Sequence, residues 1–252
     1  MFRLSDITLV GSMEELAGIP EGKVLINTIN AHSYNVAQKD EEFAEALVKG
    51  DYLIPDGSSI VKACRWLKAK SQPKERIAGW DLFAFEMQRL EGRSEKCKVK
   101  SEKCGRVMFM GSSERVLRLI RERAAGDYPN LEIVTYSPPY KAEFTEEDNR
   151  TIIKAINEAK PDLLWIGMTA PKQEKWTYQH WKELDIDCHV GTIGAVFDFY
   201  AGTATRAPKW WQAHGLEWLY RLMIEPRRMW RRYVIGNPLF IWNIRKELRG
   251  KN

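Results

Sequence analysis

The chain is poor in cysteine, with four among its 252 residues. These are Cys64, Cys97, Cys104 and Cys188, and no pair has the spacing of a metal-binding or redox motif. Disulfides persist in secreted proteins and are rare in the cytoplasm. We therefore expect four reduced thiols in a cytoplasmic protein.

Long apolar runs are also missing. Residues 1–10 mix polar and apolar side chains and lack the apolar core of a signal peptide. The longest candidate for a membrane span, residues 233–242, is ten residues long and contains Asn237-Pro238, whereas a spanning helix needs about twenty. We expect neither a signal peptide nor a membrane-spanning helix.

The common nucleotide and metal motifs are absent. The segment Gly191-Thr-Ile-Gly194 lacks the third glycine of a dinucleotide fingerprint, and no Gly-Lys-Ser/Thr of a Walker loop occurs. The four histidines are scattered, and no His/Cys/Asp cluster has the spacing of metal ligands. The sequence therefore predicts no metal site and no cofactor, and it argues against a dinucleotide-dependent epimerase or dehydrogenase.

Short apolar segments alternate with segments of helical spacing along the chain. Five segments have the composition of buried strands: residues 23–30, 52–55, 106–110, 162–167 and 188–191. This alternation indicates an α/β, Rossmann-like fold, with a mostly parallel sheet and helices on both of its faces. We assign residues 1–205 to this domain and expect its lysine-rich residues 91–105 to form a solvated loop.

The stretch around Asp56 joins one of these strands to a helix. A short apolar run ends at Pro55-Asp56-Gly57, and Ser58 begins a segment with helical spacing. Ligands of open α/β sheets bind beyond the carboxyl ends of the strands, so a carboxylate on such a turn is well placed to act as a general base. The alternative is that Asp-Gly only builds the turn and that Asp56 helps to cap the helix.

Three other strands end in glycine-containing loops. Gly111 and Ser112 follow one strand, Gly167 ends another, and Gly191 and Gly194 follow the third. Glycine lets the backbone approach a ligand closely, and the helix that follows presents free N–H groups to a phosphate. These loops predict a nucleotide-binding edge, although tight turns alone would explain the same glycines.

A nucleotide diphosphate needs positive charge around it. Because no metal-ligand motif is present, cationic side chains or helix N-termini must supply that charge. The candidates are Arg76, Arg206, Arg221 and Arg228.

Positive charge and tryptophan are concentrated at the end of the chain. Residues 206–252 contain eleven Lys/Arg and three Asp/Glu, a balance of +8, whereas the remaining 205 residues have a balance of −3. The same residues hold five of the ten tryptophans. We predict that residues 206–252 form a helical appendage to the domain.

Residues 215–235 have helical spacing in two pieces, and the second begins at Pro226. One face is apolar and another is charged: Leu216, Leu219, Tyr220, Met223 and Ile224 form the first, and Glu217, Arg221, Glu225, Arg228 and Arg232 the second. A basic, tryptophan-rich amphipathic segment is suited to an anionic membrane surface. The alternatives are that the apolar face packs on the domain or that the basic tail binds nucleic acid.

The loops and the tail together resemble those of the WecG/TagA/CpsF glycosyltransferases. The resemblance extends from about Thr28 to Arg232. It rests on an ordered series of matches: Thr28-Ile-Asn30, Pro55-Asp56-Gly57, Arg76 with Gly79 and Asp81, Gly167 through Pro171-Lys-Gln173-Glu174-Lys-Trp176, Gly191-Thr-Ile-Gly194-Ala-Val-Phe197-Asp198, Arg206-Ala-Pro208, Leu216-Glu217-Trp218-Leu219-Tyr220-Arg221 and Glu225-Pro226-Arg227-Arg228.

The resemblance implies an inverting, metal-independent glycosyltransferase. It implies that a hexose, N-acetylmannosamine or its uronic acid, moves from a UDP-sugar to N-acetylglucosamine carried on undecaprenyl diphosphate. Such transfers build bacterial cell-surface polysaccharide or teichoic acid. The enzyme would work without a cofactor or a nucleic acid, in peripheral contact with anionic lipid at the inner face of the cell membrane.

The resemblance also implies roles for single residues. Asp56 is similar to the family's general base, with Thr28 and Asn30 beside it. Arg76 and Gln173 line the pocket. With the glycine loops identified above, we assign Gln173, Glu174, Gly111, Ser112, Gly167, Gly191 and Gly194 to the donor nucleotide. Arg76, Arg206, Arg221 and Arg228 surround the diphosphate. His32 stands where relatives usually carry a carboxylate or a small polar residue, and it is either a second base or a surface or hydrogen-bonding histidine.

A different class of function fits some of the same features. A non-catalytic nucleotide-binding module with a basic, nucleic-acid-binding tail would also combine glycine loops with positive charge. It predicts tight, salt-sensitive binding of DNA or RNA and no sugar transfer.

Overall fold

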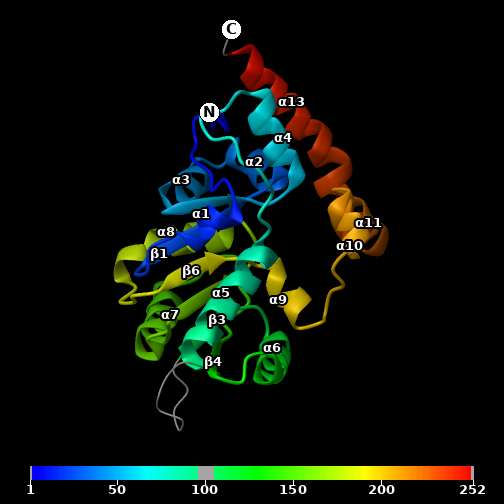
Figure 1. The fold of residues 1–252 in the computed structure, drawn as a ribbon. Helices are drawn as coiled ribbons and strands as arrows, with labels where there is room; N and C mark the ends of the chain where they lie inside the picture. Colours follow the sequence, from blue (N-terminus) through cyan, green and yellow to red (C-terminus); the bar gives the residue numbers. More distant parts are fainter. Residues whose placement is uncertain (1, 96–104, 251–252) are drawn as a thin grey trace. The chain divides into compact units, whose positions relative to one another are not determined.

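In the part of the chain that the computed structural model describes, the strands form one sheet of six in the order β2-β1-β6-β5-β3-β4. The structure describes residues 2–95 and 105–250. The strands are β1 (Val24–Ile29), β2 (Tyr52–Pro55), β3 (Gly105–Gly111), β4 (Leu131–Tyr136), β5 (Leu163–Gly167) and β6 (His189–Thr192). The pairs β1–β6, β6–β5, β5–β3 and β3–β4 are parallel. The predicted α/β fold with a parallel sheet is confirmed (Figure 1).

The chain divides into two units, and each is assembled from segments that are far apart in the sequence. Unit 1 consists of Met1–Ile19, Thr28–Ala78 and Thr205–Asn252, and unit 2 of Pro20–Asn27 and Gly79–Ala204. The C-terminal residues therefore group with the beginning of the chain. The boundary predicted after residue 205 lies one residue from the start of the last segment of unit 1, and a separate appendage stays a prediction.

The helices of unit 1 in the described residues all precede residue 79 or follow residue 205. They are α1 (Met13–Ala17), α2 (Ala31–Ala37), α3 (Glu41–Lys49), α4 (Ser58–Trp66), α10 (Lys209–Ala213), α11 (Glu217–Ile224), α12 (Pro226–Trp230) and α13 (Gly236–Arg249), with a π-helical turn, Arg231–Ile235, before α13. The break between α11 and α12 falls at Pro226, as predicted. No helix within residues 2–95 or 105–250 is long and apolar enough to cross a bilayer.

The last helix, α13, is part of the core of unit 1. Its Phe240 and Ile244 are buried in the same cluster as Ile29 and Tyr34. The Glu247 carboxylate is also buried, and it accepts hydrogen bonds from the backbone N–H groups of Leu4 (3.1 Å) and Ser5 (2.8 Å) and from the Tyr34 hydroxyl (2.7 Å). These donors replace the water that the carboxylate loses on burial, so α13 is fixed to α2 and to residues 4–5.

Unit 2 packs helices on both faces of its strands. They are α5 (Gly79–Glu95), α6 (Glu114–Asp127), α7 (Glu146–Ala159), α8 (Lys172–His180), a 3-10 turn (Trp181–Glu183) and α9 (Ala195–Tyr200). Side chains alternate along each strand, so Met108, Met110, Leu164 and Ile166 face one side, where α7 and α8 cover them. Phe109 and Trp165 face the other side and contact aromatic residues of α5 and α9.

Two expectations about local structure need correction. The strand β4 was not predicted, because it lies at the edge of the sheet and only its Leu131 is fully buried, so it has no continuous apolar run. The loop expected at residues 91–105 begins later, since α5 continues to Glu95 and β3 starts at Gly105. The rest of that loop, with Cys97 and Cys104, lies outside the described residues. Cys64 and Cys188 are buried free thiols.

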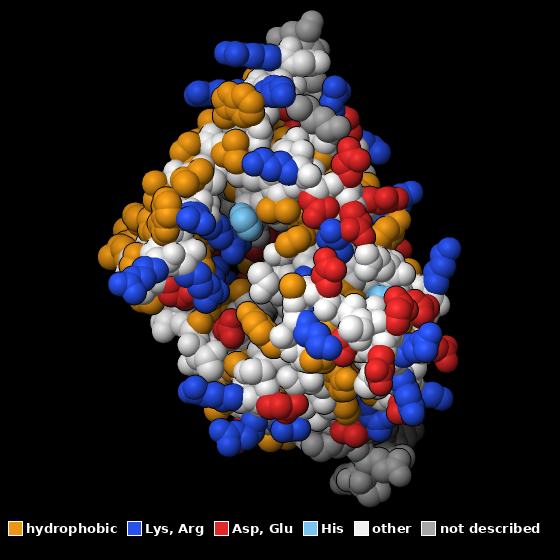
Figure 2. Space-filling view, turned by 180° about the vertical axis from the view of Figure 1, so that it is seen from behind, with side chains coloured by type: hydrophobic (Ala, Val, Ile, Leu, Met, Phe, Trp, Pro, Cys, Tyr) orange, Lys and Arg blue, Asp and Glu red, His pale blue; other side chains and the backbone are white. Residues whose placement is uncertain are grey.

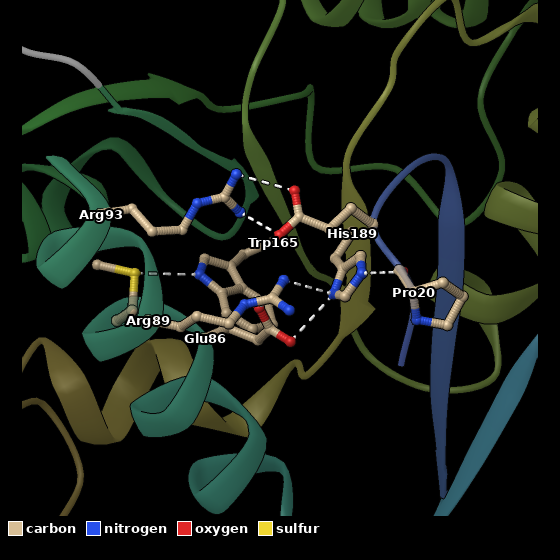
Figure 3. A network of polar contacts seen from close by, with 8 residues as sticks. Pro20, Glu86, Arg89, Arg93, Trp165 and His189 are labelled. Atoms are coloured by element: carbon tan, nitrogen blue, oxygen red, sulfur yellow. Dashed lines mark hydrogen bonds and ion pairs between the residues drawn. The ribbon is translucent and has the colours of Figure 1, made fainter. Parts of the chain in front are cut away.

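A buried polar network ties α5 to β6 in unit 2 (Figure 3). Nδ1 of His189 lies 3.0 Å from Oε1 of Glu86 and 3.1 Å from the guanidinium of Arg89, and its Nε2 lies 2.9 Å from the carbonyl oxygen of Pro20. Glu86 and Arg89 form an ion pair of 2.8 Å. Because Glu86 is almost fully buried, its contacts with Arg89 and His189 offset the cost of removing its carboxylate from water.

Replacing Glu86 by Ala should therefore lower the free energy of unfolding by about 3 kcal/mol, since Arg89 and His189 then face each other without a carboxylate. Urea unfolding at pH 7 measures this change. The matched control is Glu122→Ala, which removes an exposed carboxylate 3.7 Å from Arg118 and should change stability by no more than about 0.5 kcal/mol. Equal effects of the two variants would contradict a stabilising role for the network.

Candidate functional site

Asp56 lies at the carboxyl end of β2, on the turn that leads into α4. Gly57 is the N-cap residue of α4 and has a φ of 128°, a conformation that only glycine adopts without strain. The backbone N–H of Asp56 donates to the carbonyl oxygen of Ile29 at 2.8 Å, which places Asp56 beside the end of β1. The N-cap position therefore belongs to Gly57, not to Asp56.

Asn30 links the Asp56 carboxyl to the end of β1. Its Oδ1 caps α2 by accepting the backbone N–H groups of His32 (3.0 Å) and Ser33 (3.1 Å). Its side chain is also hydrogen-bonded to the Asp56 carboxyl, and the amide nitrogen is the group that can donate this bond. One residue thus begins a helix and orients a carboxylate. Thr28, two residues earlier, lies partly buried on β1.

Glu217, the first residue of α11, brings two predicted arginines together. Arg76 donates to its Oε2 at 3.0 Å, and Nε of Arg206 lies 3.9 Å from its Oε1. All three side chains are largely shielded from solvent, with exposed fractions of 19–22%. Glu217, in the C-terminal segment, therefore holds Arg76 and Arg206 close to each other in unit 1.

These charges act on Asp56. Burial raises the pKa of Asp56, and the negative charge of Glu217 raises it further. Arg76, Arg232 and the hydrogen bond from Asn30 lower the pKa but do not cancel the rise. A carboxylate with a raised pKa accepts a proton more readily than an ordinary one, so Asp56 is suited to general-base chemistry.

Arg232 lies in the π-helical turn before α13, a type of turn that is frequent at functional sites. Burial lowers its pKa, as do Arg221 and Arg228, whereas Tyr233 and Asp56 raise it. Its buried Nε has no hydrogen-bond partner in the described part of the chain. Arg232 thus brings an incompletely satisfied cation close to Asp56.

His32 shares this environment. Burial lowers the pKa of His32 to about 4, and the positive charge of Arg232 lowers it as well. His32 is therefore neutral near pH 7, able to donate or accept a hydrogen bond but not to add a charge. Arg228, by contrast, is 60% exposed and pairs with Glu225 at 2.8 Å, so it lies at the margin of the cluster.

The C-terminal helices expose apolar residues while part of their charged face is shielded. Glu217, Arg221 and Arg232 are partly buried, whereas Met223 and Ile224 are 64% and 53% exposed. Further large side chains are exposed alongside them, and we call the whole set the C-terminal apolar surface: Trp218, Met223, Ile224, Trp230, Val234, Ile235, Ile241, Trp242 and Leu248. Figure 2 shows hydrophobic and basic side chains interspersed over these helices. Packing on the domain, one of the alternatives, does not account for Met223 and Ile224.

Two residues of the cluster were not assigned to a site from the sequence. Glu217 and Arg232 were placed on the charged face of the tail together with Arg221 and Arg228, two predicted site residues. Their position on the same helical face as these two arginines was the available indication that they belong to the site. The spacing alone does not show which part of the protein this face contacts.

In unit 2 the predicted loops follow β3 and β5 side by side. Gly111 has a φ of 119°, and a Cβ on it would overlap the backbone of Gly167. A Cβ on Gly167 would lie 2.6 Å from the ring of Phe197. Ser112 also has a left-handed backbone, with a φ of 59°. The two strand ends can approach this closely only because residue 111 is glycine, and glycine at 167 leaves room for the ring of Phe197.

The loop after β6 has similar constraints. A Cβ on Gly191 would overlap the ring of Trp165, and one on Gly194 would lie 2.5 Å from the carbonyl oxygen of Met168. Close packing therefore explains why glycine stands at all four predicted positions. The alternative that these glycines serve only tight turns and packing explains them equally well. Nucleotide binding by these loops stays a prediction.

Gln173 and Glu174 lie in the interior of unit 2, where both are almost fully buried. Oε1 of Gln173 accepts the backbone N–H groups of Met168 and Gly194, each at 3.2 Å. Its Nε2 donates to Oε1 of Glu174 at 2.8 Å. Burial raises the pKa of Glu174 to about 7, although the hydrogen bond from Gln173 lowers it. Both side chains are engaged within the protein.

The structure therefore forms two sets of predicted residues. Unit 1 gathers Asn30, Asp56, Arg76 and Arg206, with Arg221 and Arg228 next to Arg232, and unit 2 gathers the glycine loops, Gln173 and Glu174. No group of three or more His, Cys, Asp or Glu side chains in the described ranges is placed to hold a metal ion.

Comparison with known proteins agrees with the resemblance seen in the residues. The model of the glycosyl transferase WecG/TagA/CpsF family matches residues 2–252. A Bacillus subtilis (strain 168) protein named N-acetylglucosaminyldiphosphoundecaprenol N-acetyl-beta-D-mannosaminyltransferase is 29% identical over 90% of this chain and 81% of its own length. Proteins with the same name from Bacillus spizizenii (28% identical, 97% of this chain, 88% of the relative) and Staphylococcus aureus strain NCTC 8325 (27%, 90%, 81%) are also similar.

The buried Glu174 predicts a pH dependence of stability. Its raised pKa keeps it protonated in the folded chain up to about pH 7, whereas in the unfolded chain it ionises near its ordinary value of 4.5. Its contribution to stability is therefore complete below about pH 4.5 and is lost as the pH rises to about 7. The loss amounts to about 3 kcal/mol.

Glu174→Gln should remove this dependence. The difference in unfolding free energy between the variant and the native chain should shift by about 3 kcal/mol in favour of the variant between pH 4.5 and 8, as measured by urea unfolding. The control is Glu158→Gln, measured over the same pH range, which makes the same substitution at a side chain that is 68% exposed. A pH-independent difference for Glu174→Gln would contradict the raised pKa.

Proposed function

Because the chain belongs to the WecG/TagA/CpsF family of glycosyltransferases, we propose that it transfers a hexose from a UDP-sugar to N-acetylglucosamine carried on undecaprenyl diphosphate. The names of its relatives contain this acceptor and an N-acetylmannosaminyl group. We propose N-acetylmannosamine or its uronic acid as the hexose. The observation that carries the proposal is the Asp56 carboxyl, held by Asn30 and surrounded by arginines in unit 1.

In this reaction Asp56 is the general base. The acceptor hydroxyl oxygen forms a bond to the anomeric carbon of the donor while its proton moves to Asp56. The bond from that carbon to the diphosphate oxygen breaks, and UDP leaves with the electron pair, with inversion at the carbon. The hydrogen bond from Asn30 fixes the direction of the carboxylate, and its raised pKa favours proton uptake.

Arginines neutralise the charge that develops on the departing diphosphate. We assign this role to Arg76, Arg206, Arg221 and Arg228, and add Arg232, whose partly buried guanidinium acts on the same carboxylate. Cations in a shielded site stabilise a developing anion more strongly than they would in water. The nucleoside part of the donor is assigned to the loops after β3, β5 and β6, with Gly111, Ser112 and Gly167.

A lipid-linked acceptor requires the enzyme to reach a membrane. The C-terminal apolar surface, with the exposed Arg227, Arg231 and Arg245 near it in the sequence, has the composition of an interfacial site. We propose peripheral attachment to anionic lipid at the inner face of the cell membrane. On this proposal the apolar side chains insert while arginines contact headgroups.

The first test is the variant Asp56→Asn. It keeps the shape of the side chain but cannot take up the proton, so transfer should fall by about 10²–10⁴-fold while UDP binding stays within about twofold. The assay uses UDP-N-acetylmannosamine and a short-chain prenyl-diphosphate N-acetylglucosamine, with no metal added. Calorimetry gives the affinity for UDP.

The control for this test is Asp51→Asn, an exposed carboxylate immediately before β2, which should transfer at the native rate. Equal activity of Asp56→Asn and the native chain would remove Asp56 as the base. If the native chain is inactive, UDP release across a panel of UDP-sugars, including the uronic acid, separates a wrong donor from a wrong reaction.

The second test concerns the membrane. The double variant Met223→Ser/Ile224→Ser should bind vesicles containing phosphatidylglycerol at least about tenfold more weakly than the native chain, because each buried apolar side chain contributes on the order of 1.5 kcal/mol or more. Arg227→Gln/Arg231→Gln should lose a similar amount, since each cation contributes about 1 kcal/mol. Vesicle sedimentation measures both.

The control is Trp66→Ser, which removes an apolar side chain that is 61% exposed on α4 and outside the C-terminal apolar surface. It should sediment like the native chain. If all variants sediment equally, lipid binds elsewhere on the protein. Salt-sensitive binding of DNA by the native chain would support the alternative, a nucleic-acid-binding tail.

A further inference from the structure

The side chain of Gln173 connects two loops of unit 2. Its single acceptor atom, Oε1, receives the N–H of Met168 from the loop after β5 and the N–H of Gly194 from the loop after β6. The loops are also in direct contact, since a Cβ on Gly194 would lie 2.5 Å from the carbonyl oxygen of Met168 and 2.8 Å from Oε1 of Gln173. Gln173 therefore sets the distance between the two loops.

The orientation of this amide is not determined by the loops alone. Both loop groups are donors, so the amide bridges them only with its oxygen toward them and its nitrogen away from them. The nitrogen in turn needs an acceptor in a buried place, and Oε1 of Glu174 is that acceptor at 2.8 Å. If the amide turned over, three donors would face one another without an acceptor, and buried donors in that state are costly.

Glu174 itself is poorly satisfied. The residue is 2% exposed, and its Oε2 has no hydrogen-bond partner among the residues that the structure describes. Nor is Oε2 accessible to a ligand, because it is buried. A buried oxygen without a partner weakens the fold, so its presence calls for a role beyond stability. Among the described residues, the Glu174 carboxyl accepts a hydrogen bond from its own backbone N–H and one from Gln173, and the second orients the Gln173 amide.

We propose that Glu174 is a positioning residue for the donor nucleotide: it orients Gln173, which holds the loops after β5 and β6 in the arrangement that binds the nucleoside diphosphate. This inference rests on the proposed function, since it assumes that UDP binds at these loops. It changes the expected role of Gln173 and Glu174 from contacting the nucleotide to shaping the backbone that contacts it.

The test uses the full chain and four variants: Glu174→Gln, Glu174→Ala, Gln173→Ala and the double variant Gln173→Ala/Glu174→Ala. Glu174→Gln keeps an acceptor oxygen and should bind UDP within twofold of the native chain. Glu174→Ala and Gln173→Ala should each bind UDP about tenfold more weakly. This is the effect expected from losing one of the hydrogen bonds that connect Glu174 through Gln173 to the two loops.

The double variant provides the sharpest distinction. Because Glu174 acts only through Gln173, removing both residues should weaken UDP binding no more than removing Gln173 alone. In transfer assays the losses should appear in the KM for the UDP-sugar rather than in kcat. The matched control is Glu158→Ala, an exposed carboxylate on α7 of the same unit, which should change neither quantity.

Hydrogen exchange gives a readout that does not need a ligand. The amides of Met168 and Gly194 should exchange faster in Glu174→Ala and Gln173→Ala and at the native rate in Glu174→Gln. The inference is overturned if Glu174→Ala binds UDP like the native chain, if Glu174→Gln fails as badly as Glu174→Ala, or if the two losses add. A native chain that binds no UDP would instead overturn the proposed function, and the exchange rates would still show whether Glu174 holds the loops.

Discussion

Removing a carboxylate from water is costly unless hydrogen bonds and cations replace the water, and the Asp56 carboxyl imposes this requirement on unit 1. Asn30 provides the hydrogen bond, and Arg76 and Arg232 provide positive charge. Glu217 restrains Arg76 and Arg206 but adds negative charge of its own. The pKa of Asp56 therefore stays raised. Its ionised form is stabilised less than the carboxylate of a structural ion pair would be. Such partial compensation is typical of groups that exchange protons.

The same requirement explains why the C-terminal segment has an unusual surface. A surface helix ordinarily turns its apolar face inward and its charges toward solvent. In α11 and the π-helical turn, Glu217, Arg221 and Arg232 are partly buried, and Met223, Ile224 and Val234 are exposed. Because the charged side chains of this segment face Asp56, these apolar side chains face solvent. One amphipathic segment supplies both the cations and the surface that we assign to the membrane.

Local patterns were sufficient to predict most of the sheet and the position of Asp56, because a buried strand and the turn after it are encoded within a few neighbouring residues. The edge strand β4 was missed since only Leu131 is fully buried. Long-range partners were not predictable: Arg76 and Glu217 are 141 residues apart, and helical spacing shows which residues share a face but not what that face meets. A local pattern can also have two explanations. Gly191 would suit a phosphate-binding loop, but glycine is needed there in any case because a Cβ would overlap the ring of Trp165.

The discontinuous composition of unit 1 has a consequence for how the chain is made. All residues of unit 2 have left the ribosome once residue 204 emerges, whereas unit 1 still lacks α10 to α13. Until Phe240 and Ile244 are synthesised, the apolar side chains that they cover in the core of unit 1 remain exposed, and surface of this kind favours aggregation. Arg221 and Arg232 emerge together with the C-terminal apolar surface, after all of unit 2. A nascent chain that has reached only residue 204 therefore has neither the full cation cluster nor this surface.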